Sequence, residues 1–351
     1  MADKYQLTDE SMIHNGHTLW RIVENSTGVK GGWIESESNL SQSGQCMVLD
    51  EAKVYGNAVV SGNAIVMDQA EVYDDVRVSD QAKIHGNARV SLKSIIVDDA
   101  QVAGFAQVAG YVLLCDEAMV TDYAIIQGRV SLKGNSKVYD EAKLFDYATV
   151  SDFGQVYGQA QVYGFAGILG NVKVYDNARV CESINLTGNT AIYGRAFVGG
   201  YGTINENCKI YGNAQITGTV LLANFAEVYG DAQLKGNITL LNKAEVYGQA
   251  VLQGTVFVVD NAKVFGEAEV DGDMVVLRNN GCLYDQAKMY DVSTIYGNAQ
   301  VYGQATIKNY GQVFEEAKVY DQALVKDSAW VYGHASIGGN TVVAGNERIF
   351  E

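Results

Sequence analysis

The stretch Ala52–Asp75, AKVYGN AVVSGN AIVMDQ AEVYDD, contains four consecutive copies of a six-residue pattern. The pattern continues in phase to Asn279, and after one extra residue, Asn280, it resumes from Gly281 to Asn346. Position 1 is most often Ala, position 3 is Val, Ile, Leu or Met in every copy, and positions 5 and 6 are mostly Gly, Asp, Asn, Gln or Glu. A short fixed period of this kind indicates a solenoid of stacked coils.

Each copy of the pattern predicts one short strand and one corner. Strand side chains alternate, so position 3 faces the interior while positions 2 and 4 face outward. Gly56-Asn57 is typical of the corners, because Gly and Asn adopt positive φ at low cost. Three copies close a coil of 18 residues, and a chain without proline suits strands whose N–H groups all bond neighbouring coils. We therefore expect an all-β, single-stranded parallel β-helix of about 16 coils.

Three segments are expected along the chain. Residues 1–45 break the pattern and form an N-terminal cap, in which Leu19–Glu24 (LWRIVE) is predicted to be a strand. Residues 46–346 form the β-helix, and residues 347–351 form its C-terminal end. A β-helix has an open edge at each end, and charged or irregular segments there discourage edge-to-edge pairing.

Composition narrows the classes of function. A net charge of −16 argues against nucleic-acid binding, which relies on basic side chains that displace counterions. The five cysteines are scattered without metal or disulfide spacing, which favours a reducing compartment. Neither a signal peptide nor a membrane-spanning apolar run is recognisable, so a cytoplasmic protein is expected. No cofactor or metal motif is found.

Face one of the predicted coil carries an aromatic column at position 4. Stacked rings would support the coils, while a ligand platform for a flat partner or a glycan is the alternative function. The column repeats every 18 residues, and its tyrosines are Tyr139, Tyr157, Tyr175, Tyr193, Tyr211, Tyr229, Tyr247, Tyr284, Tyr302 and Tyr320.

The other two faces differ in charge. Face two, which includes Lys53, Glu71, Arg89, Lys143 and Arg179, is mixed, and we assign it no function. The outward positions of face three carry no charge from Thr149 to Tyr332, and an uncharged strip of that length exceeds what soluble monomers usually expose. We therefore predict a homo-oligomer, a trimer or a dimer, with an interface formed by Leu169, Leu221, Leu241, Phe257, Val259, Val275, Leu277, Phe314, Trp330 and Tyr332.

Two resemblances extend these expectations. The period resembles that of the hexapeptide-repeat proteins, which implies triangular, left-handed coils. The segment Lys30–Cys46, KGGWIESESNLSQSGQC, and the pattern V-x-D-E-A-x-V-Y-G-N-A that starts at Val48 resemble the YdcK-like branch of that family. This branch is bacterial and phage-associated, and the resemblance implies a left-handed β-helix without a transferase assignment.

An acyltransferase of the hexapeptide-repeat type is the enzymatic alternative. Such enzymes have a catalytic His and a loop that leaves the helix, whereas the extra residue in this chain is too short for a loop. His85, which faces outward on face one, is the weak candidate for a general base. We favour a non-enzymatic structural or interaction rod with an unknown protein or glycan partner. A glycan-binding module and an acidic DNA-mimic decoy are further alternatives.

Overall fold

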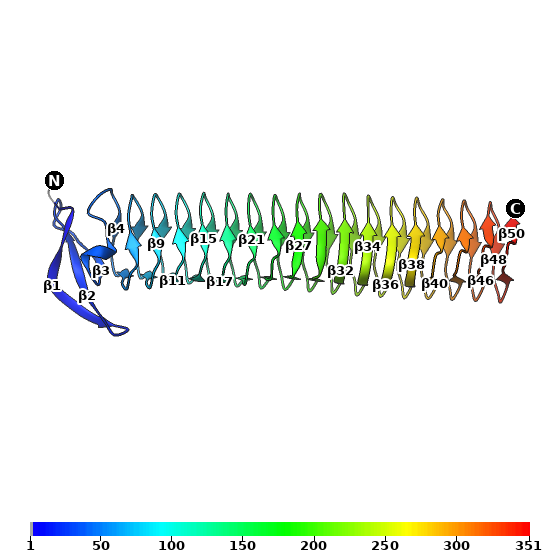
Figure 1. Ribbon diagram of the computed structural model, residues 1–351, viewed down its shortest axis with the longest axis horizontal. Helices are drawn as coiled ribbons and strands as arrows, with labels where there is room; N and C mark the ends of the chain where they lie inside the picture. Colours follow the sequence, from blue (N-terminus) through cyan, green and yellow to red (C-terminus); the bar gives the residue numbers. More distant parts are fainter. Residues whose placement is uncertain (1–2) are drawn as a thin grey trace. The chain divides into compact units, whose positions relative to one another are not determined.

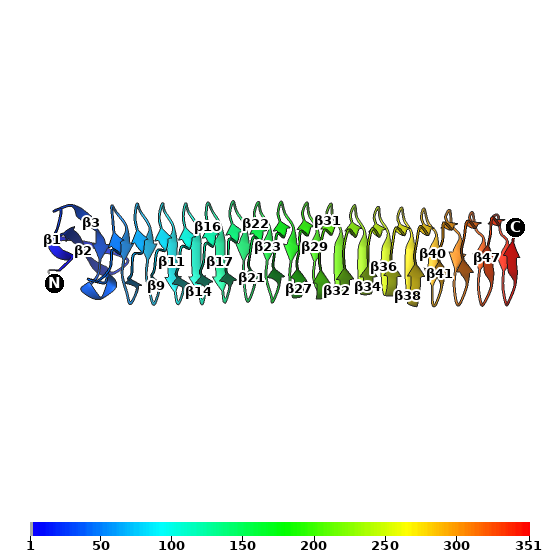
Figure 2. The same cartoon turned by 90° about the horizontal axis from the view of Figure 1, so that it is seen from above.

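The computed structural model describes residues 3–351, which fall into two compact units, unit 1 up to Asp176 and unit 2 from Asn177 to Glu351. Figures 1 and 2 show stacked coils in each unit, with strands of successive coils side by side. Strand residues of successive coils pair in parallel, mostly with the residue 18 positions on, as Lys83 does with Gln101. The predicted all-β parallel solenoid with 18-residue coils is therefore confirmed, and its left-handed sense stays a prediction.

The N-terminal residues form an antiparallel extension of face two. Strands β1 (Tyr5–His14) and β2 (His17–Glu24) make a hairpin, and its turn residue Asn15 has a φ of 49°. Strand β2 pairs antiparallel with β3 (Lys30–Ile34), which pairs in parallel with β5 (Lys53–Val54). The predicted strand Leu19–Glu24 is confirmed within β2.

The parallel ladder includes residues from both predicted end segments. At the N-terminal end, Trp33 of β3 pairs with Lys53. At the C-terminal end, β50 (Arg348–Phe350) pairs with β47 (Trp330–Tyr332). The described part of the chain has one helix, the short 3-10 helix η1 (Glu37–Asn39), and no helix there is long and apolar enough to cross a membrane.

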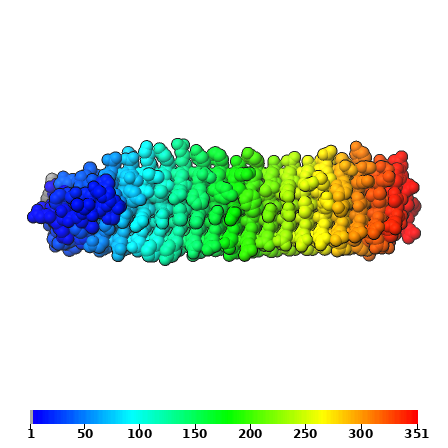
Figure 3. Space-filling view, turned by 90° about the horizontal axis from the view of Figure 1, so that it is seen from below, coloured from blue at the N-terminus to red at the C-terminus, as the bar shows by residue number. Residues whose placement is uncertain are grey.

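Aspartate carboxylates connect the corners of successive coils. The fifth residue of most copies adopts positive φ, as Gly56 does at 67°, and many of these residues are Asp. The Oδ2 atom of Asp122 accepts the N–H of Asp140 at 3.2 Å, and the Oδ2 atom of Asp140 accepts the N–H of Gly158 at 3.0 Å. Each such bond satisfies a corner N–H that the ladder leaves unpaired. In Figure 3 the side chains of neighbouring coils accordingly form parallel ridges within each unit.

Four long strands of unit 2 run from face two through the corner into face three. They are β32 (Gln215–Leu222), β34 (Gln233–Leu240), β36 (Val251–Val258) and β38 (Glu269–Leu277). Between β36 and β38 the register shifts by one residue, because Gly254 pairs with Gly272 but Val256 pairs with Val275. The extra residue therefore lies at Asp273 or Met274, and its predicted position at Asn280 is wrong.

Candidate functional site

The tyrosines of face one stack on one another. In unit 2 the ring centroids of Tyr193 and Tyr211 lie 4.9 Å apart with 4° between the ring planes, and those of Tyr229 and Tyr247 lie 4.7 Å apart with 1°. This stack continues through Phe265, Tyr284, Tyr302 and Tyr320. In unit 1 the same contact joins Tyr139, Tyr157 and Tyr175. Each stacked pair contributes about 0.5–1.5 kcal/mol beyond its buried area, so the column stabilises the stacking of coils.

Hydrogen bonds to carboxylates fix the tyrosine hydroxyl groups. The hydroxyl of Tyr211 donates to Oε2 of Glu227 at 3.4 Å, and that of Tyr229 donates to Oε2 of Glu245 at 3.2 Å. Lys209 forms an ion pair with Glu227 at 2.9 Å. Burial, followed by the charge of Glu227, raises the pKa of Tyr211 to about 12, so this hydroxyl stays a hydrogen-bond donor at any physiological pH.

The ring orientation limits what the column can bind. Both faces of each inner ring, such as Tyr211 or Tyr229, are covered by the rings of neighbouring coils. A sugar stacks on ring faces, whereas this column presents ring edges and hydroxyl groups. The contacts assign the column a structural role, and ligand binding by it stays a prediction.

Face three differs from its prediction where the register shifts. Val275 and Leu277 were predicted to face outward, but both side chains are 0% exposed in the interior. The extra residue upstream moves both residues to inward positions and turns Val276 outward. The same shift places Arg278 on the surface, where its guanidinium lies 4.8 Å from the centroid of the Tyr296 ring. The predicted uncharged strip is therefore interrupted, and Val275 and Leu277 are not interface residues.

The remaining face-three residues form two different surfaces in unit 2. Leu221 is 41% exposed, and Leu241, Phe257 and Val259 are half-buried, so this part is apolar and open. Toward the C-terminus the rings stack instead, with 4.7 Å between Tyr296 and Phe314 and 5.0 Å between Phe314 and Tyr332. Arg348 covers Trp330 at 4.2 Å. In unit 1, Leu169 is half-buried.

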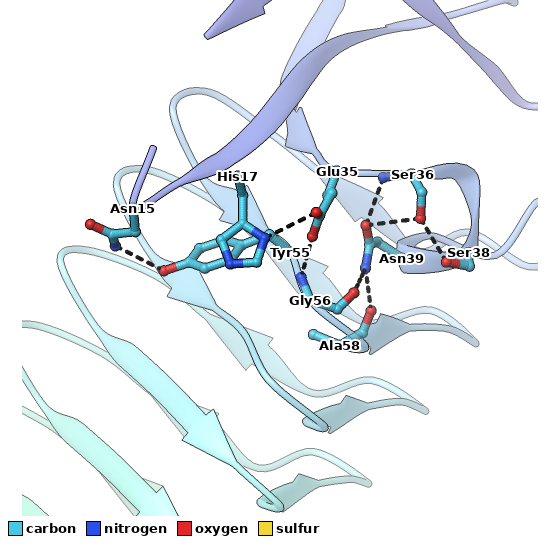
Figure 4. Close-up of polar contacts among 9 residues, drawn as sticks. All are labelled: Asn15, His17, Glu35, Ser36, Ser38, Asn39, Tyr55, Gly56 and Ala58. Carbon is cyan, nitrogen blue, oxygen red and sulfur yellow. Dashed lines mark hydrogen bonds and ion pairs between the residues drawn. The ribbon is translucent and has the colours of Figure 1, made fainter. Parts of the chain in front are cut away.

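A polar cluster holds the N-terminal hairpin against face two (Figure 4). Nδ1 of His17 lies 3.0 Å from Oε1 of Glu35, whose Oε2 accepts the N–H of Gly56 at 2.7 Å. At the hairpin turn, Nδ2 of Asn15 donates to the hydroxyl of Tyr55 at 3.2 Å. The hydrogen bond from His17 is the main cause of the lowered pKa of Glu35. These contacts fix the hairpin turn over the first coil.

Glu51 connects the same hairpin to β3. Its Oε2 accepts the indole N–H of Trp33 at 3.0 Å, and its Oε1 lies 2.8 Å from a guanidinium nitrogen of Arg21. The guanidinium of Arg21 also lies 4.9 Å from the centroid of the Trp33 ring. The hydrogen bond from Trp33 is the first cause, and that from Arg21 the second, of the lowered pKa of Glu51.

Protonation of Glu51 is therefore expected to weaken the docking of the hairpin. Because its pKa is lower in the folded state than in the unfolded state, its contribution is complete above the ordinary pKa of Glu and is lost as pH falls through the folded value. The NMR resonance of the Trp33 indole N–H should shift in acid with a midpoint below about 4.3, the usual pKa of Glu. Glu51→Gln should remove this titration. A midpoint at or above the ordinary value contradicts the prediction.

His85, the candidate general base, has no orienting group hydrogen-bonded to its ring among residues 3–351. Its Nδ1 lies 3.9 Å from Oδ2 of Asp68, which is beyond hydrogen-bond length. That Oδ2 atom instead accepts the N–H of Gly86 at 2.8 Å. The geometry around His85 therefore gives no support to the acyltransferase alternative.

An exposed cluster of Asp98, Cys115 and Asp116 brings three potential metal ligands within 4.8 Å of one another. Both carboxylates have corner roles, because Oδ2 of Asp98 accepts the N–H of Asp116 at 3.1 Å and Oδ2 of Asp116 accepts the N–H of Gly134 at 2.9 Å. Burial, followed by the charge of Asp116, raises the pKa of the Cys115 thiol. The contacts in this cluster thus serve the corners of the coils.

Two shallow grooves that were not predicted lie along the edge between faces one and two. One lies in unit 1 and contains Arg89 and Phe105, and the other lies in unit 2 and contains Arg179 and Phe197. A signal for both was present in the sequence, because Asn-Ala-Arg occurs at 87–89 and again at 177–179. Because the charge of face two is mixed, no function was predicted for this repeated Asn-Ala-Arg motif.

The ladder pairing and the bonded corners define the class of the protein as a parallel β-solenoid with 18-residue coils. Within this class, residues 52–68 match the family model described as YdcK Beta solenoid repeat. The chain therefore carries a YdcK-type solenoid repeat, as the sequence resemblance implied. No curated protein matches the chain in sequence.

Proposed function

We propose that the protein is a non-enzymatic interaction scaffold that associates with further copies of itself through face three of unit 2. The observation that carries the proposal is the apolar surface around Leu221, Leu241, Phe257 and Val259. Leu221 and Phe257 belong to β32 and β36 of one continuous ladder, and Leu241 and Val259 directly follow the last residues of β34 and β36. The backbone bonds of these strands are used within the ladder, so a partner must pack on the side chains.

A second copy of the chain suits this surface because it carries the same rows at the same coil spacing. Ridges of one copy can then fit between the ridges of another, as in an interface formed by one self-complementary surface. Stacked tyrosines and corner carboxylates support the scaffold role, since they hold neighbouring rows of side chains in register. The rows are therefore ready for binding without an ordering step, which lowers the entropic cost of association.

Val259→Glu should dissociate the oligomer. A carboxylate in an apolar interface loses its hydration without gaining a partner, which costs several kcal/mol. Light scattering after size exclusion should give a dimer or trimer for the wild type and a monomer for the variant. Val251→Glu is the matched control, because Val251 lies at the start of β36 on face two, whereas Val259 directly follows the last residue of that strand, and this variant should keep the wild-type mass. A monomeric wild type, or a Val259→Glu variant of unchanged mass, contradicts the proposal.

A further inference from the structure

The groove in unit 1 combines aromatic, basic and amide side chains. It has a volume of about 610 Å3 and crosses four successive coils at the edge between faces one and two. Strands β11 (Arg89–Leu92), β14 (Gln107–Gly110), β17 (Ile125–Gly128) and β20 (Lys143–Leu144) supply its floor. Its lining includes Asn87, Arg89, Phe105, Gln107, Tyr123 and Lys143.

Unit 2 carries a second groove that also combines aromatic, basic and amide side chains. Its volume is about 570 Å3, and it is lined by Asn177, Arg179, Arg195, Phe197 and Gln215. In each unit the first coil of the groove presents Asn and then Arg two residues on. The next coil presents a Phe, and a Gln follows on that coil or on the one after it. The combination of Asn, Arg, Phe and Gln is therefore present once in each unit.

The basic side chains of both grooves are free to bind an anion. Arg89, Arg179 and Arg195 are exposed, and none of them, nor Lys143, forms an ion pair with any residue in the range 3–351. The chain as a whole carries a net charge of −16. The two grooves, with their unpaired cations, therefore differ in charge from the protein as a whole.

One carboxylate lies in the unit 1 groove and none lies among the lining residues of the unit 2 groove. Glu141, the carboxylate in unit 1, accepts a hydrogen bond from Nε2 of Gln159 at 3.0 Å and lies two residues from Lys143. The unit 2 groove is therefore the more basic of the two, and we expect it to bind an anion more tightly.

The two aromatic rings of the unit 1 groove are more accessible than those of face one, whereas Phe197 in the unit 2 groove is half-buried. Phe105 and Tyr123 are 50% and 60% exposed and stack as an isolated pair, with centroids 5.1 Å apart. Because the neighbouring coils carry Asn87 and Glu141 at the equivalent corner, the outer face of each ring meets no further ring. Such a ring can pack against the apolar side of a sugar.

The polar groups match a ligand that carries both carboxylates and hydroxyls. A guanidinium binds a carboxylate through two parallel hydrogen bonds. The amides of Asn87 and Gln107, and of Asn177 and Gln215, each offer donors and an acceptor, which is what a hydroxyl group requires. A uronic or sialic acid residue combines a carboxylate, several hydroxyls and an apolar face.

Two other polymers fit less well. An extended peptide binds by adding a strand to a free sheet edge, whereas the backbone in the grooves is already paired, as in the 2.9 Å bonds from the N–H of Arg89 to Ala106 and of Phe197 to Ala214. A nucleic acid carries a phosphate at every nucleotide, and two cations per groove on an acidic protein give little counterion release. We propose that each groove binds a carboxylate-bearing glycan, a function beyond the self-association argued above and independent of it.

The test is isothermal titration calorimetry of the full chain with polygalacturonate, hyaluronate and polysialic acid. Methyl-esterified polygalacturonate is the neutral match, and polyglutamate and polyphosphate are the non-glycan anions. At least one acidic glycan should bind, and its affinity should exceed that of both non-glycan anions and, for polygalacturonate, that of its ester by about tenfold or more, as expected for one charge-assisted hydrogen-bonded pair. Arg179→Gln with Arg195→Gln should lower the affinity at least tenfold, and Arg89→Gln should lower it less.

Arg77→Gln, which removes an exposed charge from face three, is the matched control and should bind as the wild type does. Unchanged circular dichroism and melting temperature will show that the groove variants are folded. The proposal is overturned if no acidic glycan binds, if polyglutamate or polyphosphate binds equally well, or if the Arg179/Arg195 double variant keeps wild-type affinity. Val259→Glu should leave glycan affinity unchanged, so failure of glycan binding can be distinguished from failure of self-association.

Discussion

Gly212→Val should destabilise unit 2 by about 3 kcal/mol, because positive φ costs a side chain of this kind 1–3 kcal/mol and the new Cβ also meets the next coil. Gly212 has a φ of 75°, and a Cβ there would lie 2.9 Å from both N and O of Gly230. The second methyl group of valine prevents the small backbone adjustments that relieve such contacts. Neighbouring coils must then separate, and stability in a solenoid depends on those contacts.

Gly212→Asp is the matched comparison, since it adds the same Cβ without branching. Asp122 and Asp140 already occupy successive positions of this corner at φ values of 57° and 56°. An aspartate at 212 can donate nothing but can accept the N–H of Gly230, as other corner carboxylates do, so its stability should stay within about 1 kcal/mol of the wild type. Thermal unfolding followed by circular dichroism, with hydrogen exchange at Gly230, distinguishes the two. Equal loss in both variants would mean that any Cβ, and not branching, is what the corner rejects.

The fold was predictable because the same six-residue pattern indicates a β-solenoid at every coil. Position 3 is aliphatic throughout, and the corner positions accept positive φ, so strand direction and burial follow from the period. The role of aspartate was less visible. The sequence places Asp at many corners, but its carboxylate accepts an N–H one coil away, a contact that only the stacked structure reveals.

The position of the extra residue was predicted wrongly because the periodic pattern fits two registers at this point of the sequence. Val275, Val276 and Leu277 are all aliphatic, so position 3 is satisfied whether Val276 or its two neighbours face inward. Pairing with β36 decides between the two registers and moves Arg278 to the surface. A one-residue slip reverses the direction of each side chain in a strand, and the predicted interface was wrong at Val275 and Leu277 for this reason.

The candidate sites were predictable to different degrees. The tyrosine column followed from its spacing of 18 residues, but the direction of its ring faces depends on packing and was not predictable. The hairpin contacts of Asn15 and His17 with Tyr55 and Glu35 join residues from segments without a common pattern. No period could have revealed them.

Asn39→Leu should destabilise the N-terminal part of unit 1 by about 2–4 kcal/mol, since it leaves buried polar groups without partners. Asn39 is 0% exposed. Its Oδ1 accepts the N–H of Ser36 at 2.9 Å, and its Nδ2 donates to the carbonyl oxygens of Gly56 at 3.0 Å and Ala58 at 2.9 Å. The amide thereby joins η1 to the coil beneath it, as Figure 4 shows.

Asn39→Asp separates hydrogen bonding from packing, because it keeps the shape but turns a carboxylate oxygen toward two carbonyl oxygens. At neutral pH it should be at least as destabilising as Asn39→Leu, and part of the loss should be recovered in acid, where the protonated carboxyl can donate to one of them. Ser38→Ala is the control. Within the described part of the chain that exposed hydroxyl bonds only the hydroxyl of Ser36, at 2.7 Å, and its loss should change stability by less than about 0.5 kcal/mol. Urea denaturation followed by tryptophan fluorescence measures all three variants. If Asn39→Asp is as stable as the wild type at neutral pH, the two carbonyl contacts are not what holds η1 in place, and packing around the side chain must do so.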